Sequence, residues 1–575
     1  MKPDSRKSKL VLLGWAAALM TSAAFIPAVA QAAPKCTALA TQLLTNSDIT
    51  AATSVVQAAA SGHLSYCLVN ITVSDLSGPK NGYLPGQKQQ INIGIGLPLS
   101  TDDGGSGGTQ GNWNGRIENL GGGGFAGTVG SVTNATDAGY AGSSTDTGHS
   151  NALGGTFDLN ADNTLNWGLI RDFASNGVHD QAVWTKKLVH MYYGMEPKYT
   201  YWNGCSTGGR QGYAEAQLYP DDHDGILAGA PAVNWPVLST SQQWGEIVMN
   251  QELGAPIAPA KLTAVTNAAI AACDLLDGVA DGVVQDPRAC NYSAKSFVCK
   301  GTASDPANCL TAAEAGAVDK IWQGPTKKGF RLWFGSERGT SLASLNGPTA
   351  FSISTLFLQY WVYQDPTFDW HTLTETTFGQ AFNETAVKFN NVLANSDPDL
   401  SAFRKRGGKM ISYHGLADQL IYPRGTYNYY NAATERAGGL KQVQKFFRFF
   451  PFAGNRHCGG GNPEQPNAPL QNSNDLFNAL VGWVEKGVAP DYIIGYNNTN
   501  HALATVSRPV CMYPNRLVYK GTGSTSVPAN FTCRHEDDDD FVRADFVLPF
   551  VGARHEVSDD DHGHEMMASD EDHRH

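Results

Sequence analysis

The residues best suited to chemistry are Ser206 and His457, because each stands next to a cysteine. Ser206 is the centre of the run GCSTG at 204–208, a G-x-S-x-G pattern typical of the sharp strand-to-helix turn that exposes a serine hydroxyl. Cys205 precedes this serine, and Cys458 follows the histidine. If the two cysteines are bonded, the disulfide holds a nucleophile beside a candidate general base. The pattern favours an esterase-type hydrolase.

Asp418 is the candidate for the acidic member of a catalytic set. It comes between Ser206 and His457 in the chain, which is the order found in α/β-hydrolases. A serine needs a base to take its proton, and a third group must hold that base in one tautomer. Taken singly, each residue has an ordinary explanation. The GCSTG run fits a chance match in a chain with 62 glycines, Asp418 fits a helix cap, and His457 fits an ordinary loop histidine. Their order, each at the end of an expected strand, predicts a Ser-His-Asp triad.

The chain also offers backbone N–H donors for an oxyanion. The N–H of Thr207, directly after the candidate nucleophile, is the first. The glycine run 121–124 follows an expected strand, where hydrolases of this kind place the second donor. Consecutive glycines let a backbone approach a ligand closely, although a plain flexible turn has the same composition.

A second group of polar residues lies between Cys273 and Cys290. Asp274, Asp277 and Asp281 are closely spaced and are separated by glycines. Carboxylates on a glycine-bent loop suit calcium, which takes six to eight oxygen ligands. The spacing is not that of an EF-hand, and an Asx-rich turn remains an alternative.

Short apolar runs alternate with helical patterns, which predicts an α/β fold. The expected helices cover 178–193 and 209–218, and the expected strands cover 66–73, 91–97, 116–120, 139–143, 199–202, 225–228, 409–413 and 446–450. The rhythm stops at about residue 231 and resumes near 400. We therefore expect an α/β-hydrolase core in two parts, 34–230 and 401–533, with a lid domain inserted at 231–400 that contains the possible calcium loop.

The two ends of the chain differ from this body. Residues 1–33 combine basic residues, an apolar stretch and the A-x-A site Ala28-Val29-Ala30, which predicts a signal peptide rather than a retained anchor. Residues 534–575 hold 14 acidic and 4 basic residues, and so most of the net charge of −12; this composition predicts a flexible acidic, histidine-rich tail. We expect a secreted or periplasmic protein without membrane attachment after cleavage. The sequence shows no cluster of basic residues of the kind that binds nucleic acid.

Ten cysteines fit an oxidising destination. Sequence alone leaves their connectivity open. Proximity along the chain suggests bonds between neighbouring cysteines and leaves one distant pair. The suggested pairs are Cys36–Cys67, Cys273–Cys290, Cys299–Cys309, Cys511–Cys533 and the distant Cys205–Cys458.

Taken together, these residues resemble the tannase and feruloyl esterase family of α/β-hydrolases, over about residues 36–533. The hallmark of the family is a Cys-Ser, Asp, His-Cys set, matched here by Cys205-Ser206, Asp418 and His457-Cys458. The resemblance implies an oxyanion hole formed by the amides of Gly124 and Thr207. It also implies a lid domain with a structural calcium ion. Its implied ligands are the carboxylates of Asp274, Asp277 and Asp281 and the backbone carbonyls of Val279 and Val283.

The family includes feruloyl esterases, tannases that act on galloyl esters, and a branch (MHETase) that cleaves a terephthalate monoester. The resemblance implies a serine carboxylic-ester hydrolase acting on a small aromatic ester of the hydroxycinnamoyl type. Galloyl esters and a terephthalate monoester are the alternatives. The segment 358–361 has Gln359 and no nearby arginine for a substrate carboxylate, which disfavours the terephthalate branch. A rival of another class is an exported binding protein, which has no use for a serine–histidine pair. The oligomeric state is not indicated.

Overall fold

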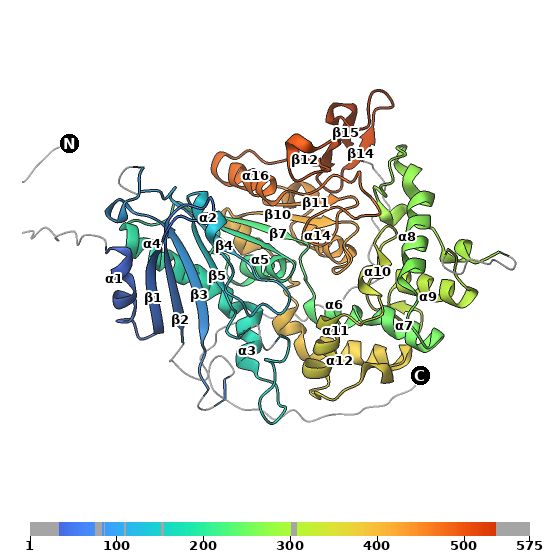
Figure 1. The fold of residues 1–575 in the computed structure, drawn as a ribbon, viewed down its shortest axis with the longest axis horizontal. Coiled ribbons are helices and arrows are strands. Elements are labelled where there is room, and N and C mark those ends of the chain that lie inside the picture. Colours follow the sequence, from blue (N-terminus) through green and yellow to red (C-terminus); the bar gives the residue numbers. More distant parts are fainter. Residues whose placement is uncertain are drawn as a thin grey trace, which may run out of the picture.

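The computed structural model describes residues 34–74, 83–84, 87–107, 111–150, 154–300 and 308–535. At its centre is a nine-stranded sheet in the order β1-β2-β3-β5-β4-β6-β7-β10-β11 (Figure 1). Neighbours from β1 to β5 in this order are antiparallel, and those from β5 to β11 are parallel. The strands are β1 (Ile49–Gln57), β2 (Tyr66–Val73), β3 (Ile91–Pro98), β4 (Arg116–Leu120), β5 (Ala141–Thr145), β6 (Tyr199–Cys205), β7 (Gly225–Gly229), β10 (Lys409–Gly415) and β11 (Phe447–Phe452).

Helices cover both faces of this sheet. Successive residues of a strand point to opposite sides, so the apolar residues of a buried strand need packing partners on each face. Trp202 of β6 packs with Tyr213 and Tyr430, which belong to α5 (Thr207–Leu218) and α14 (Arg424–Arg436). Tyr201, the preceding residue, packs with Leu480 of α16 (Ser473–Lys486) on the other face. The other helices around the sheet are α1 (Cys36–Leu43), α2 (Thr133–Asp137), α3 (Trp167–Arg171), α4 (Gly177–Tyr193), α13 (Ser401–Arg406) and α15 (Leu440–Val443). The predicted α/β class is confirmed.

The expected strands and helices all form, with shifted ends. The strand β5, expected at 139–143, is shifted at both ends and is found two residues later. Gly139 instead closes the turn after α2: its φ is +81°, and its N–H donates to the carbonyl of Thr136 at 2.9 Å. The expected strand therefore included residues 139 and 140, which lie between α2 and β5. The elements α1 and β1 were not expected.

Residues 231–400, here called the inserted segment, leave the sheet after β7 and return at β10 (Figure 1). Because β7 and β10 are paired neighbours, the sheet is continuous across the insertion. The segment is mainly helical, and its apolar residues, such as Trp244, Trp361 and Phe378, share one buried cluster with Phe125, Phe157 and Phe173 from the first part of the chain. Its elements are α6 (Trp235–Ser241), α7 (Trp244–Leu253), α8 (Pro259–Cys273), α9 (Ala312–Gln323), β8 (Thr326–Lys327), β9 (Phe330–Arg331), α10 (Leu342–Leu345), α11 (Ser352–Leu356) and α12 (Glu375–Leu393).

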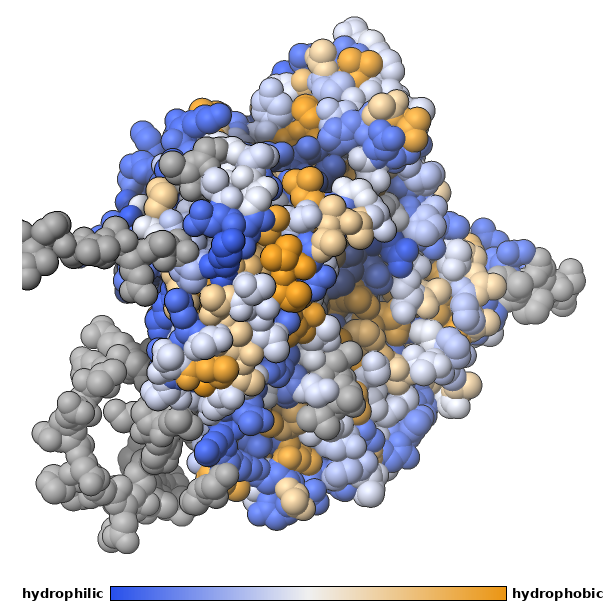
Figure 2. Space-filling model, turned by 60° about the vertical axis from the view of Figure 1, so that its left-hand side comes forward, coloured by the Kyte–Doolittle hydropathy of each residue, from blue (hydrophilic) through white to orange (hydrophobic). Residues whose placement is uncertain are grey.

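The described part of the chain ends in two small antiparallel pairs, β12 (Tyr492–Tyr496) with β13 (Ser507–Cys511) and β14 (Arg516–Tyr519) with β15 (Phe531–Arg534). All five suggested disulfides are present, so the predicted pairing is confirmed. Figure 2 shows hydrophilic residues around the edge of one face and apolar residues gathered near its centre.

Within the described part of the chain, no helix has both the length and the apolar character that a membrane span requires. The predicted signal peptide, 1–33, and residues 536–575 of the predicted tail lie outside the described residues.

Candidate active site

Ser206 occupies the turn between β6 and α5. Its backbone adopts φ 64° and ψ −122°, a sparsely populated conformation that persists only where the surroundings enforce it. The Ser206 N–H donates to the carbonyl of Gly229 at 2.9 Å. The turn is too tight for a side chain at Gly204, because a Cβ there would lie 2.5 Å from the carbonyl oxygen of Gly208. The GCSTG run therefore forms the predicted strand–turn–helix elbow.

Asp418 and His457 follow the neighbouring strands β10 and β11. The Nδ1 of His457 lies 2.8 Å from Oδ2 of Asp418. The Asp418 side chain is fully buried, and 13% of the His457 side chain is exposed. The carboxylate therefore holds one edge of the imidazole, and the partly exposed Nε2 edge remains for a substrate or nucleophile.

Close contact between two loops makes this pairing possible. A Cβ on Gly415 would lie 2.4 Å from the carbonyl oxygen of Asn455, so only glycine lets the loops approach. The N–H of Ala417 donates to that carbonyl at 2.9 Å. The backbone N–H of His457 donates to Oε1 of Gln419 at 3.2 Å. Gln419 was not predicted, because its partner lies 38 residues away on another loop.

Asp418 is held by three donors besides His457. The N–H groups of Leu420 and Ile421 donate to Oδ1 at 2.8 and 2.9 Å. Nε2 of His414 lies 3.1 Å from Oδ2 and 3.0 Å from the carbonyl of Ile421. Since a carbonyl only accepts, Nε2 of His414 carries the proton, and its Nδ1 accepts from the Thr426 hydroxyl at 2.8 Å. His414 is thus a positioning residue that the sequence argument missed, although it stands only four residues before Asp418 in the run HGLAD at 414–418.

The electrostatics suit an ionised acid and a histidine base. Burial alone would raise the pKa of Asp418, but the charge of His457 and hydrogen bonds from His414 and His457 hold that pKa well below its usual range. Burial lowers the pKa of His457, and the charge and hydrogen bond of Asp418 outweigh this effect. The pKa of His457 therefore lies above its ordinary value.

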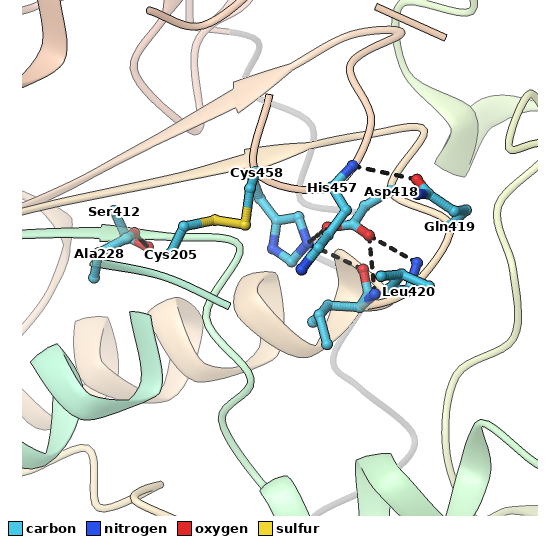
Figure 3. The surroundings of a disulfide bond; sticks show 10 residues. Cys205, Ala228, Ser412, Asp418, Gln419, Leu420, His457 and Cys458 are labelled. Carbon is cyan, nitrogen blue, oxygen red and sulfur yellow. Dashed lines mark hydrogen bonds and ion pairs between the residues drawn. A yellow bond between two sulfur atoms is a disulfide. The ribbon is translucent and has the colours of Figure 1, made fainter. Parts of the chain in front are cut away.

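The disulfide between Cys205 and Cys458 joins the nucleophile turn to the histidine loop (Figure 3). It spans 253 residues of sequence, with a Cα–Cα distance of 5.8 Å. One cysteine directly precedes Ser206 and the other directly follows His457. The structure thus brings all three predicted triad residues to one edge of the sheet.

The glycine run lies against the start of α5. A Cβ on Gly208 would be 3.1 Å from Cα of Gly121, so the two backbones are in direct contact. Gly124 has a φ of +54°. Within the described residues, neither the N–H of Gly124 nor that of Thr207 donates a hydrogen bond. Both predicted oxyanion donors are therefore without a hydrogen-bond acceptor among the described residues.

The predicted calcium loop is closed by the Cys273–Cys290 disulfide. Oδ1 of Asp274 accepts hydrogen bonds from three consecutive N–H groups, those of residues 281–283, at 2.8 to 3.2 Å. Oδ1 of Asp277 accepts from the N–H of Val279 at 3.0 Å, and Oδ1 of Asp281 accepts from that of Val283 at 2.9 Å. The three carboxylates therefore shape the loop through one oxygen each.

The remaining oxygens decide whether calcium fits this loop. Oδ2 of Asp274 and Oδ2 of Asp277 accept no hydrogen bond from another described residue, and Oδ2 of Asp281 is paired with the buried Arg508. The described residues contain no group of three or more His, Cys, Asp or Glu side chains placed to hold a metal ion. The donor atoms are of the kind that calcium prefers, but only two carboxylate oxygens, Oδ2 of Asp274 and Oδ2 of Asp277, are free of these contacts.

Gln359 forms hydrogen bonds with other residues of the inserted segment. Its Nε2 donates to the carbonyl of Phe368 at 2.9 Å, and its backbone carbonyl accepts from the N–H of Asp365. Its amide therefore stabilises the loop after the π-helical turn Phe357–Val362.

Comparison with known proteins supports the resemblance over most of the chain. The family model "Tannase and feruloyl esterase" matches residues 109–534. A probable feruloyl esterase from Arthroderma benhamiae is 35% identical over 483 residues, covering 81% of this chain and 85% of that protein. A probable feruloyl esterase B-2 from Neosartorya fischeri is 34% identical, covering 73% of this chain and 82% of that protein.

Solved structures agree with these matches. Feruloyl esterase B from Aspergillus oryzae has a TM-score of 0.72 and 26% identity, covering 87% of this chain and all of that chain. Tannin acyl hydrolase from Aspergillus niger also has a TM-score of 0.72, with 23% identity, and covers 85% of this chain and 92% of that chain; its likeness concerns the fold. This chain therefore belongs to the tannase and feruloyl esterase family and is a carboxylic ester hydrolase.

Proposed function

We propose that this enzyme is an exported serine esterase that releases a hydroxycinnamic acid, such as ferulic acid, from an ester. The observation that carries the catalytic assignment is the buried Asp418–His457 pair, linked through Cys205–Cys458 to Ser206. Relatives named as feruloyl esterases support the aromatic acid. Five disulfides and the signal pattern at 1–33 support export.

The first half of the reaction forms an acyl-enzyme. Oγ of Ser206 attacks the ester carbonyl carbon while Nε2 of His457 takes the hydroxyl proton. The carbonyl oxygen becomes an oxyanion, and the N–H groups of Gly124 and Thr207 donate to it. His457, now an imidazolium stabilised by Asp418, gives its proton to the departing alcohol as the carbon–oxygen bond breaks.

The second half repeats these roles with water. His457 takes a proton from water, the resulting hydroxide attacks the acyl carbon, and the same two N–H groups hold the oxyanion. The proton then returns to Oγ of Ser206, and the aromatic acid leaves. The inserted segment acts as the lid, because Ile353 lies 3.7 Å from the position of a Cβ on Gly124.

A substrate panel tests the proposed acid. We expect purified enzyme to hydrolyse methyl ferulate with a higher kcat/KM than methyl gallate or a terephthalate monoester, measured under identical conditions. A higher kcat/KM for methyl gallate would reassign the enzyme as a tannase. A higher kcat/KM for the terephthalate monoester would contradict the expectation, drawn from Gln359 and the lack of a nearby arginine, that this substrate is disfavoured. Hydrolysis of none of the three would contradict an aromatic acyl group.

We also propose that the loop 274–283 binds a structural calcium ion. The ligands would be the carboxylates of Asp274, Asp277 and Asp281 with the carbonyls of Val279 and Val283, and Asp281 would have to share its charge with Arg508. A ligand that binds only the folded state raises Tm. We expect dialysis against a chelator to lower Tm by a few °C, added calcium to restore it, and Asp277→Asn to abolish the response. An unchanged Tm in wild type would exclude the ion.

A further inference from the structure

The glycine run that contains Gly124 is tied to α5 by two buried side chains. The N–H of Gly122 donates to Oε1 of Gln211 at 2.9 Å. The hydroxyl of Thr207 donates to the carbonyl of Gly124. Both side chains are fully buried. The helix that follows the nucleophile therefore fixes the glycine run on both sides of residue 123.

A third hydrogen bond sets the direction of the Gly124 N–H. The carbonyl of Gly123 accepts from the N–H of Ala126 at 2.7 Å. In a planar trans peptide the carbonyl and the N–H point in opposite directions. The Gly124 N–H therefore points away from Ala126, and it does so only while this turn is held.

The space beside Gly123 and Gly124 is nearly empty. A Cβ on Gly123 would meet no atom within 4 Å, and one on Gly124 would meet only Ile353, at 3.7 Å. Glycine populates positive and negative φ about equally, so the run has no intrinsic preference for the observed φ of +54° at Gly124. The orientation of the N–H depends on contacts from outside the run.

We propose that the Thr207 hydroxyl and the Gln211 amide are positioning residues for the oxyanion hole. They hold the Gly122–Gly124 backbone so that the Gly124 N–H faces the same point as the Thr207 N–H. Thr207 thus contributes twice, its N–H to the oxyanion and its hydroxyl to the geometry of the other donor. This inference rests on the proposed serine esterase mechanism.

The decisive variant is Thr207→Val, which keeps the shape of the side chain and its backbone N–H but removes the hydroxyl. We expect kcat for methyl ferulate to fall about 10- to 100-fold, less than the loss of a whole oxyanion donor. Binding of an aryl boronic acid, a mimic of the tetrahedral oxyanion, should weaken by a similar factor, since only the transition state gains from this geometry. Binding of free ferulate should change less than about twofold. Thr207→Ser restores the hydroxyl and should recover most of kcat.

Thr185→Val is the matched control. Thr185 is equally buried, and its hydroxyl donates within its own helix, to the carbonyl of Gln181 in α4 at 2.6 Å. We expect its kcat and boronic acid affinity to match wild type. Gln211→Met should reproduce the Thr207→Val pattern, and it keeps the test open if Thr207→Val fails to fold.

The outcomes separate this inference from the mechanism on which it rests. Native kcat and native boronic acid affinity in a folded Thr207→Val would overturn the positioning role while leaving the esterase intact. Equal loss of ferulate and boronic acid binding would also overturn it, because that pattern reports general damage to the site. Wild type no faster than Ser206→Ala would instead contradict the proposed function.

Discussion

Ser206→Ala is expected to lower kcat for methyl ferulate by about five to six orders of magnitude. The substitution removes the attacking oxygen and leaves the elbow backbone, because the hydrogen bonds of the turn come from the main chain of Ser206. Tm should therefore stay close to wild type. Rates are to be measured with highly purified protein, since traces of wild type would otherwise dominate the residual activity.

Ser54→Ala provides the control for this experiment. Ser54 lies on the edge strand β1, where its hydroxyl oxygen accepts from the N–H of Ala40. We expect full activity in this variant. If Ser206→Ala retained even a few per cent of wild-type kcat, Ser206 could not be the nucleophile.

Asp418→Asn should lower kcat by about four orders of magnitude. An asparagine can present its NH₂ to Nδ1 of His457 and so favour the wrong tautomer, with the proton on Nε2. That tautomer cannot accept the proton of Ser206. The charge that stabilises the imidazolium is also lost.

The same variant should change the pH dependence of kcat/KM. In wild type the pKa of His457 lies above its ordinary value, and only neutral imidazole accepts a proton. Activity should therefore fall as pH drops through a midpoint above that of a free histidine. Removing the Asp418 charge lowers the pKa of His457 and moves the midpoint of the residual activity to lower pH.

Asp369→Asn is the charge-matched control. Asp369 is exposed on the inserted segment, where its Oδ1 is 2.6 Å from Nδ1 of His371. Its loss should leave both kcat and the pH midpoint unchanged. An identical midpoint in wild type and Asp418→Asn would show that the buried carboxylate does not act on the base.

Much of the candidate active site could be predicted because short sequence patterns mark its residues. The elbow needs glycine at 204 to let its backbone pass Gly208, and apolar runs mark the strands that precede Asp418 and His457. The strands β10 and β11 are parallel neighbours, and only β7 separates β10 from β6, so the carboxyl ends of the three strands lie at the same edge of the sheet. The flanking cysteines then indicated which serine and which histidine meet.

Other parts left no local signal. Gln419 and Gln211 act on backbone N–H groups 38 and 89 residues away in the sequence, those of His457 and Gly122. The helix α6 is buried on all sides, so it lacks the polar face that creates a helical period. β1 has a mostly exposed face rich in alanine and threonine, and its pattern was too polar for a strand to be expected.

Covalent labelling is the most direct test of the proposed mechanism. Wild type is to be treated with a serine-directed aryl phosphonate and the modified peptide identified by mass spectrometry. We expect one adduct per chain, located on Ser206, with none in Ser206→Ala and much slower labelling in Asp418→Asn. An adduct on another residue, or undiminished labelling of Ser206→Ala, would contradict the assignment of the nucleophile.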